Sequence, residues 1–284
     1  MKQLVVISGK GGTGKTTMTA SLASLAEGVA VVADCDVDAP DLHLILKPEI
    51  LETFDFLGLQ TARIDPEKCA ECGECEKACR FDAIHDFRVD PRGCEGCKVC
   101  TIVCPSDAVT MVDSVSGHAY VSKTRFGTMV HADLFPGEEA SGKLVTMVRE
   151  LAIKVAEREK KDLVLIDGSP GIGCPVIASI TGTDIALVMT EPTISGAHDL
   201  ERILGVAKHF GVEPLVVVNK YDLNLDMTEE IDRLCHELGV DLAGKLPFDP
   251  GVVEAMISGK TLVEVKGPVG DAIRSVWDRI ETKL

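Results

Sequence analysis

The chain has 284 residues, of which 45% are hydrophobic and 26% charged, and its formal net charge is −16. This composition suits one large globular domain, or one such domain with a small domain added. The acidity, which no run of Lys or Arg relieves, argues against sequence-independent binding to nucleic-acid phosphates. No apolar run reaches the ~18–20 residues that span a bilayer, and the first, LVVI at residues 4–7, is too short for a signal peptide. We therefore expect a cytoplasmic protein, in which eleven cysteines indicate metal or redox chemistry rather than disulfides.

The N-terminal residues predict a phosphate-binding loop. KQLVVI (2–7) reads as a buried strand and MTASLASLAEG (18–28) as a helix, and SGKGGTGKTT (8–17) lies between them. Such a loop turns backbone N–H groups and a helix N-terminus toward phosphate oxygens. Within it, Lys15 would reach the β- and γ-phosphates and Thr16 would hold Mg²⁺. The candidate nucleotide-binding residues are Gly9, Lys10, Gly11, Gly12, Thr13, Gly14, Lys15, Thr16 and Thr17.

A second lysine, Lys10, precedes Gly11 and Gly12, so the loop resembles the deviant Walker A motif KGGxGKT. That motif is typical of the MinD/ParA/Mrp and nitrogenase-iron-protein class of P-loop ATPases. The resemblance implies that Lys10 acts in trans on a partner's nucleotide and that ATP closes a homodimer. The alternative is a surface lysine without a role. Lys10 and Lys15 are thus two of the three candidate catalytic residues.

The third candidate is an acid at the end of the next strand. VAVVADCDVDAPDL (29–42) predicts a strand with Asp34 and Asp36 at its C-terminal end, where α/β sheets place their ligands. The resemblance implies that Asp36 orients the attacking water or Mg²⁺. The alternative is that these acids only cap a turn.

Further strands complete the predicted sheet. DLVLIDGSPGIGCP (162–175) contains a buried strand ending in Asp167, typical of a Walker B acid that holds Mg²⁺ through water. The glycine-rich residues 168–173 then resemble a loop that senses the γ-phosphate. Strands at 184–192 and 214–222 alternate with helical stretches, which predicts a doubly wound parallel sheet with helices on both faces.

The base-binding end of the site is predicted from the strand at 214–222. Asn219, Lys220 and Asp222 spell NKxD, a motif that reads guanine elsewhere. The resemblance implies instead that Asn219 contacts adenine and that Pro247, in LPFDP (246–250), packs beside the base. We therefore expect ATP, with GTP as the alternative.

Eight cysteines lie between residues 69 and 104 in two groups of identical spacing, C-x₂-C-x₂-C-x₃-C. The groups repeat with a period of 25 residues. The repeat extends beyond the cysteines, because RIDPEKC (63–69) matches RVDPRGC (88–94). This pattern indicates an internal duplication.

The spacing is that of bacterial two-cluster ferredoxins, in which the fourth cysteine of each run ligates the other cluster. We therefore expect two [4Fe–4S] clusters in an inserted βαββαβ ferredoxin-like domain, with a pair of structural zinc sites as the alternative. Arg80 stands where the pattern has proline, and a cation there is expected to shift the potential of the second cluster. The expected ligands are Cys69, Cys72, Cys75 and Cys104 for the first cluster, and Cys79, Cys94, Cys97 and Cys100 for the second.

Three features lie outside these motifs. We expect Cys235 to be a buried packing residue. Cys174 follows the γ-phosphate loop, and a cluster bridging two subunits there, as in nitrogenase iron protein, is left open. The C-terminal AIRSVWDRIETKL (272–284) carries a helical apolar stripe that we expect to dock onto the domain, membrane contact being the alternative. Residues 113–142 are expected to return the chain to the main sheet.

The resemblance covers nearly the whole chain. It implies a doubly wound α/β P-loop ATPase, residues 1–60 and 113–284, interrupted by a ferredoxin-like insert at 61–112. In the function it implies, ATP-dependent dimer closure gates electron transfer through the two clusters to a redox partner. One alternative is assembly of iron–sulfur clusters or metallocofactors, with a metallocluster-acceptor protein as partner. Another is a nucleotide switch whose clusters are purely structural.

Overall fold

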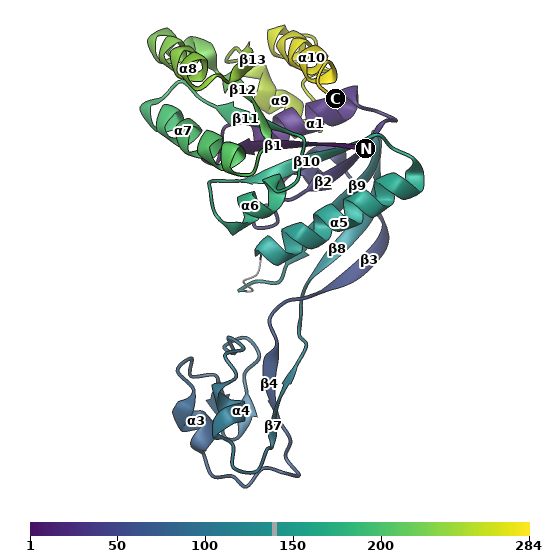
Figure 1. The fold of residues 1–284 in the computed structure, drawn as a ribbon. Helices are drawn as coiled ribbons and strands as arrows, with labels where there is room; N and C mark the ends of the chain where they lie inside the picture. Colours follow the sequence, from purple (N-terminus) through teal and green to yellow (C-terminus); the bar gives the residue numbers. More distant parts are fainter. Residues whose placement is uncertain (138–140) are drawn as a thin grey trace. The chain divides into compact units, whose positions relative to one another are not determined.

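The computed structural model describes residues 1–137 and 141–284, which form two compact units (Figure 1). The larger unit contains residues 1–53, 119–132 and 141–284. The smaller unit contains residues 54–118 and the described part of 133–140. The smaller unit therefore contains all of the segment 61–112 that the sequence assigns to an insert, and it extends over residues 54–60 and 113–118, which the sequence assigns to the ATPase domain.

A nine-stranded sheet forms the centre of the larger unit, in the order β13-β12-β11-β1-β10-β2-β9-β8-β3. Every strand pair from β13 to β9 is parallel. The predicted parallel α/β sheet is therefore confirmed. The strands are β1 (Lys2–Ser8), β2 (Ala30–Asp34), β3 (Glu49–Leu57), β8 (Val115–Thr124), β9 (Gly127–Leu134), β10 (Leu163–Pro170), β11 (Ile185–Thr190), β12 (Glu213–Asn219) and β13 (Asp241–Leu246).

The inner strands are apolar throughout because helices cover both faces of the sheet. Leu4 and Val6 of β1 belong to the core cluster shared with α1 and α10, whereas the fully buried Val5 and Ile7 alternate to the opposite face. Figure 1 shows α5, α6 and α7 on that opposite face. The helices are α1 (Lys15–Leu25), α2 (Leu42–Leu46), α5 (Ser141–Glu159), α6 (Cys174–Ile180), α7 (Ile194–His209), α8 (Leu225–Leu238), α9 (Gly251–Ile257) and α10 (Pro268–Glu281), with a 3₁₀ turn, η1, at Tyr221–Leu223.

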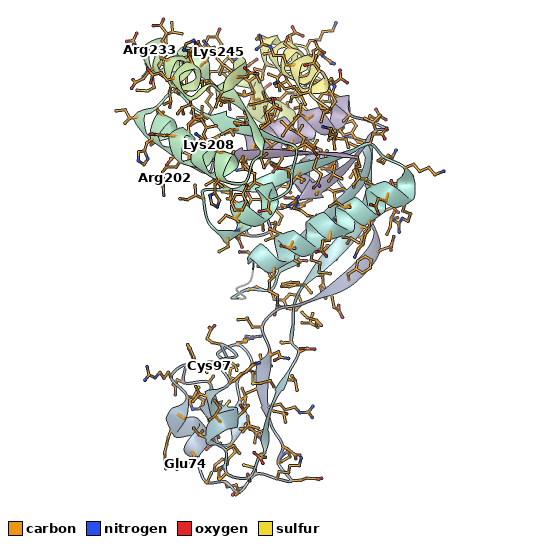
Figure 2. The ribbon with its side chains drawn as sticks, viewed as in Figure 1. Glu74, Cys97, Arg202, Lys208, Arg233 and Lys245 are labelled. Atoms are coloured by element: carbon orange, nitrogen blue, oxygen red, sulfur yellow. The ribbon has the colours of Figure 1, made fainter. Side chains whose placement is uncertain are left out.

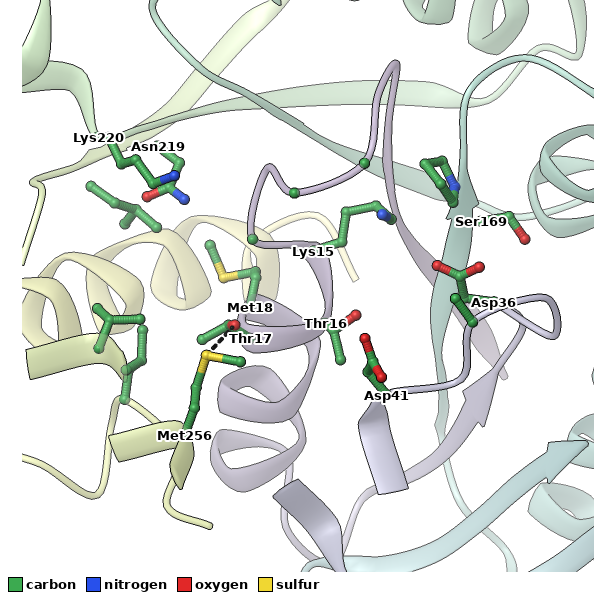
Figure 3. A pocket seen from close by; sticks show the side chains of 18 of the residues that line it. Lys15, Thr16, Thr17, Met18, Asp36, Asp41, Ser169, Asn219, Lys220 and Met256 are labelled. Carbon is green, nitrogen blue, oxygen red and sulfur yellow. Dashed lines mark hydrogen bonds between the residues drawn. The ribbon is translucent and has the colours of Figure 1, made fainter. Parts of the chain in front are cut away.

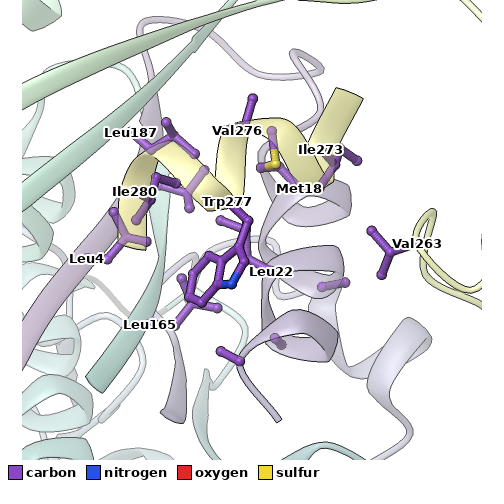
Figure 4. Packing of buried hydrophobic residues seen from close by; sticks show 14 of the residues in the cluster. Leu4, Met18, Leu22, Leu165, Leu187, Val263, Ile273, Val276, Trp277 and Ile280 are labelled. Atoms are coloured by element: carbon purple, nitrogen blue, oxygen red, sulfur yellow. The ribbon is translucent and has the colours of Figure 1, made fainter. Parts of the chain in front are cut away.

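The C-terminal helix α10 docks onto the domain as predicted. Its apolar stripe, which includes Ile273, Val276 and Ile280, is fully buried. Figure 4 shows Trp277, the single tryptophan of the chain, beside Leu22 of α1. None of the described helices has the length and apolarity that a membrane span requires.

Residues 113–142 return the chain to the main sheet, as expected, through β8 and β9. The two strands are joined by Arg125 and Phe126. The end of this expected segment, residues 138–140, lies outside the described residues.

The smaller unit has the element order βαββαβ. Its two sheets are antiparallel pairs, β4 with β7 and β5 with β6. The elements are β4 (Thr61–Ile64), α3 (Glu74–Ala78), β5 (Ile84–His85), β6 (Arg88–Val89), α4 (Val99–Val103) and β7 (Val109–Val112).

The sequence repeat in this unit is also a structural repeat. Helices α3 and α4 begin 25 residues apart, each after a residue in the left-handed conformation, Gly73 or Lys98. The halves bind each other reciprocally: the N–H of Asp65 donates to the carbonyl of Ala108, and the N–H of Asp90 to that of Ala83, both at 2.8 Å. These bonds relate the two halves by a pseudo-twofold axis.

Candidate functional site

The loop between β1 and α1 borders a cavity of about 590 Å³ (Figure 3). Two of its glycines are required by geometry. Gly14 has φ of 90°, and a Cβ there would lie 2.7 Å from Nδ2 of Asn219. A Cβ on Gly9 would lie 2.5 Å from the Cβ of Asp199. The loop can therefore keep this path only with glycine at both positions.

One end of the cavity carries a lysine and several carboxylates (Figure 3). Lys15, Thr16 and Asp36 line it together with Asp38 and Asp41. Burial raises the pKa of Asp36 to about 6, the charge of Lys15 opposes the rise, and the two neighbouring acids add to it. This end of the cavity therefore has more negative charge than Lys15 alone balances.

Asp167 lies behind this end, at the C-terminal end of β10, and is 1% exposed. Its Oδ1 accepts a hydrogen bond from the Thr19 hydroxyl at 2.9 Å. Its Oδ2, like Oδ2 of the adjacent buried Asp34, has no partner among the described residues. Burial raises the pKa of Asp167 to about 6, although Lys15 lowers it. A cation bound nearby would relieve these carboxylates, and Thr16 with carboxylate-held water is the donor set that Mg²⁺ takes beside a phosphate.

The opposite end of the cavity is more apolar. Val252, Val253 and Met256 of α9 line it with Leu246 of β13. Pro247 follows Leu246 but is not itself among the described lining residues.

Asn219 also lines this end, and its Nδ2 donates to the carbonyl of Thr13 at 3.0 Å. The amide thus fixes the phosphate loop. The Oδ1 atom and the second N–H of the Asn219 amide remain for hydrogen bonds to a nucleotide base.

Lys10 points away from the cavity into a polar cluster of its own chain. Its Nζ lies 3.6 Å from Glu191 Oε2 and donates to the hydroxyls of Thr193 and Ser195, both at 3.3 Å. Glu191 also binds Nζ of Lys220 at 2.6 Å. One carboxylate therefore holds two lysines, one from the phosphate loop and one from the base end.

The eight clustered cysteines of the smaller unit border two small voids. Each void takes three cysteines from one repeat and the fourth from the other, which is the grouping expected from the spacing. One is lined by Cys69, Cys72, Cys75 and Cys104. The other is lined by Cys79, Cys94, Cys97 and Cys100.

Backbone N–H groups point at several of these sulfurs. Those of Ala83 and Ala108 donate to Cys79 and Cys104 at 3.5 and 3.3 Å, which are equivalent contacts in the two repeats. The pKa of Cys104 is lowered, first by its contact with the Ser106 hydroxyl. Such donors stabilise thiolate, the form that binds metals.

The sulfurs are not arranged for a single ion. Among the described residues, no group of three or more His, Cys, Asp or Glu is placed to hold one metal ion. A zinc site needs all its ligand sulfurs about 2.3 Å from one point. Sets of four thiolates are ligands for a zinc ion and for an iron–sulfur cluster alike, so the donor set suits either group.

The remaining cysteines fall in the larger unit. Cys235 is 1% exposed in α8 and is the packing residue that we expected. Cys35 is buried at the end of β2, and burial raises the pKa of its thiol far above the usual range. Cys174, at the start of α6, is exposed.

Comparison with known proteins places these features in a family. The CobQ/CobB/MinD/ParA nucleotide binding domain matches residues 4–263. The chain belongs to this family. An uncharacterised protein of Methanocaldococcus jannaschii is 33% identical over 98% of this chain and 96% of its own length. The septum site-determining protein MinD of Bacillus subtilis is 26% identical over 98% of this chain and 88% of its own.

Solved MinD structures have the same fold. The cell division ATPase MinD of Pyrococcus furiosus superposes with a TM-score of 0.60 at 22% identity, over 99% of this chain and 98% of that one. MinD of Pyrococcus horikoshii, solved with Mg-ADP, gives a TM-score of 0.60 at 19% identity, over 99% and 96%. The family match and the shared fold confirm the predicted MinD/ParA superfamily of P-loop ATPases.

Within the MinD/ParA fold, two site residues were missed by the sequence analysis. Thr19 lies one helical turn after Lys15, so its position on α1 could have suggested a contact with the Walker B acid. Glu191 follows β11, and an acid at the C-terminal end of a parallel strand is a ligand-site signal.

Proposed function

We propose that this MinD/ParA-family protein is an ATPase whose nucleotide-dependent dimer closure gates electron transfer through two [4Fe–4S] clusters. The observation that carries the electron-transfer part is the pair of voids, each bordered by four cysteines drawn from both repeats. The family match and the geometry of residues 9–17 support the ATPase part.

The cavity residues suit Mg-ATP. Lys15 would neutralise charge on the β- and γ-phosphates, and the Thr16 hydroxyl would hold Mg²⁺ while Asp167 holds its water. Asp36 lies at the same end of the cavity and would orient the attacking water. The raised pKa of Asp36, about 6, suits a group that accepts a proton near neutral pH. Support for Mg-nucleotide comes from the P. horikoshii MinD complex with Mg-ADP.

Dimer closure is proposed from Lys10. In the isolated chain this lysine is held by Glu191, Thr193 and Ser195. To reach a partner's phosphate it must exchange these contacts for the nucleotide. A nucleotide that draws Lys10 across an interface would therefore favour the dimer over the monomer.

Iron–sulfur clusters fit the smaller unit better than zinc does. The cysteine spacing is that of two-cluster ferredoxins, and the βαββαβ element order agrees with such a domain. The N–H···S contacts to Cys79, Cys94 and Cys104 are the kind that tune cluster potentials. When bound, such clusters supply one-electron redox chemistry. The four cysteines that line each void would hold them.

The alternative function is assembly or transfer of clusters. One observation favours it: Cys72 and Cys97 are exposed, one beside each void. An acceptor's thiolates could reach these ligands. Against it, each void is closed by cysteines of both repeats, so release of a cluster would require the repeats to separate.

The two functions differ in what ATP does to the clusters. The protein is purified anaerobically, and its iron, sulfide and electron paramagnetic resonance spectrum are measured; about eight irons per chain are expected. The midpoint potentials are then compared with and without Mg-ATP, and apo-acceptor proteins are added. Gated electron transfer predicts nucleotide-dependent potentials with clusters retained, whereas cluster movement to the acceptor would overturn it in favour of assembly.

Control variants test each part alone. Lys15→Gln is expected to abolish ATP hydrolysis and leave the iron content unchanged. Tighter binding of a GTP analogue than of an ATP analogue would overturn the choice of ATP. Loss of the iron with an intact fold would overturn the cluster assignment.

A further inference from the structure

The two repeats of the smaller unit act as an internal control for what the fold requires. Their helices α3 and α4 have the same length, begin 25 residues apart and precede equivalent cysteines. A side chain needed by the fold in one repeat should therefore have a similar counterpart in the other. Differences between exposed counterparts point to function.

The outer faces of the two helices differ sharply. On α4, Val99, Ile102 and Val103 are 39%, 81% and 36% exposed, and their i, i+3 and i+4 spacing places them on one face. Their counterparts on α3 are Glu74, Lys77 and Ala78, and Lys77 Nζ binds Glu74 Oε1 at 2.9 Å. The fold therefore tolerates a charged face here.

The apolar face continues onto the void held by Cys79 and Cys97. Phe81, 48% exposed, lines this void together with Val99. The counterpart of Phe81 is Ser106, which lines the other void. Figure 2 shows Glu74, on α3, and Cys97, which lines the same void as Phe81 and Val99, at opposite ends of the smaller unit.

Cations lie next to this surface in the sequence, since Arg80 precedes Phe81 and Lys98 precedes Val99, and Lys98 also lines the void. Arg80, Arg92 and Lys98 are all exposed, where the other repeat has Pro105, Glu67 and Gly73. The exposed Glu95 is the acid that has no counterpart in the other repeat, since Ala70 stands there. Asp82 has a counterpart in Asp107 and makes no difference between the ends. These three cations outnumber the two acids Glu95 and Asp82 by one, in a chain whose net charge is −16.

We propose that Phe81, Val99, Ile102 and Val103 form the docking surface for a small acidic electron-transfer protein. This inference rests on the proposed electron-transfer function and names its entry point, the centre held by Cys79, Cys94, Cys97 and Cys100. An apolar centre excludes water between two redox proteins, and the neighbouring cations attract a partner whose docking face carries carboxylates. Exchange of one electron across the surface oxidises one protein and reduces the other, and it transfers no atom.

The test exchanges the faces of the two repeats. Val99→Glu with Ile102→Lys gives α4 the pair that α3 already carries, so the fold should accept it. The matched control, Glu74→Val with Lys77→Ile, places the apolar pair on α3. Each full-length protein is reduced anaerobically after iron and sulfide analysis. Its second-order rate of electron exchange with flavodoxin, an acidic carrier whose flavin absorbance reports the transfer, is measured by stopped flow at several salt concentrations.

We expect the α4 variant to exchange electrons at least about tenfold more slowly than the parent at equal iron content, since charges then occupy the apolar centre. The α3 variant should match the parent, and the parent's rate should fall as salt rises. Equal rates for the parent and the α4 variant, both loaded with clusters, would overturn the docking surface alone. A parent without iron and sulfide would overturn the proposed function and this inference with it.

Self-association is the other occupant to exclude, and sedimentation of the cluster-loaded parent and α4 variant decides it. An unchanged oligomeric state supports the acidic partner. A parent oligomer that dissociates in the α4 variant would assign the surface to a second copy of the chain and overturn the proposal.

Discussion

The two units stabilise their sites in different ways. The larger unit buries long apolar strands between helices and places its polar site at the C-terminal ends of those strands. The smaller unit has a core of Ala62, Ile84 and Val109 completed by two cysteines, Cys75 and Cys100. A core this small contributes little, and small domains then depend on metals or other cross-links. The larger unit should therefore fold without its ligand, whereas the smaller should depend on its own.

The largest expected effect is loss of the smaller unit's fold. Cys100→Ser removes one of the four thiolates proposed to hold a cluster at one void, so we expect loss of most of the about eight irons and cleavage of the smaller unit by proteases. ATP binding by the larger unit should remain. The control is Cys235→Ser, at a buried helical cysteine of the larger unit. If the Cys100→Ser protein lacks iron but resists proteases, the smaller unit folds without its ligand, as the larger unit does.

Asp167 tests the larger unit's independence from its ligand. The pKa of Asp167 rises from 3.8 to about 6 on folding, chiefly by burial. Between these values the folded state binds more protons than the unfolded state, so the free energy of unfolding falls as pH rises through this range and stays lower above it. Asp167→Asn should therefore stabilise the metal- and nucleotide-free protein by about 2–3 kcal/mol at pH 8 and by little below pH 4. Urea unfolding at both pH values measures this.

The exposed Asp162→Asn, just before the same strand, is the control for this experiment. A destabilised Asp167→Asn protein at pH 8 would mean that the hydrogen bond from Thr19 outweighs the cost of burying the charge.

Glu191 tests how the larger unit holds Lys10 in the monomer. Glu191→Gln weakens two ion pairs, and we expect about a fivefold gain in dimerisation, or ~1 kcal/mol, at a given ATP concentration. Sedimentation velocity measures the dimer fraction, and Glu201→Gln on the outside of α7 is the control. A lower dimer fraction would mean that Glu191 supports the dimer instead.

The smallest expected effect lies beside Cys79. Arg80→Pro makes this position equal to its counterpart Pro105 and removes a cation near one centre. A cation favours the more negative, reduced form, so that centre's potential should fall, by less than the ~59 mV of a tenfold change in a one-electron equilibrium. Redox titration followed by electron paramagnetic resonance measures both centres. Unchanged potentials would show that Arg80 is solvent-screened.

Much of the fold and of the candidate site followed from local patterns. The parallel sheet was predictable because strands buried on both faces are apolar runs, and the phosphate loop because only glycines permit its path. The cysteine sets were predictable because the spacing is that of two-cluster ferredoxins, in which the fourth cysteine of each run joins the other set.

What the sequence did not reveal depends on tertiary contacts. The contact between Thr19 and Asp167 joins residues 148 positions apart, so the helical position of Thr19 points to it only when β10 is known to pack beside α1. The role of Glu191 depends on Lys10 and Lys220 converging from two other segments. We expected the side-chain amide of Asn219 to contact adenine, but it donates a hydrogen bond to the carbonyl of Thr13. The apolar face of α4 could be interpreted only when the structure showed that its side chains are exposed and that the equivalent face of α3 is charged.

Each void takes its fourth cysteine from the other repeat, and this affects the order in which the two voids can bind their groups. Neither half contains a complete set of four thiolates, so the first group bound must close the segment between Cys69 and Cys104 or between Cys79 and Cys94. That closure costs chain entropy only for the first group bound. The second set of four thiolates is then already held close together, so its effective concentration for binding a second group is high. Half-filled molecules should accordingly be rare, and the two centres should be gained and lost together.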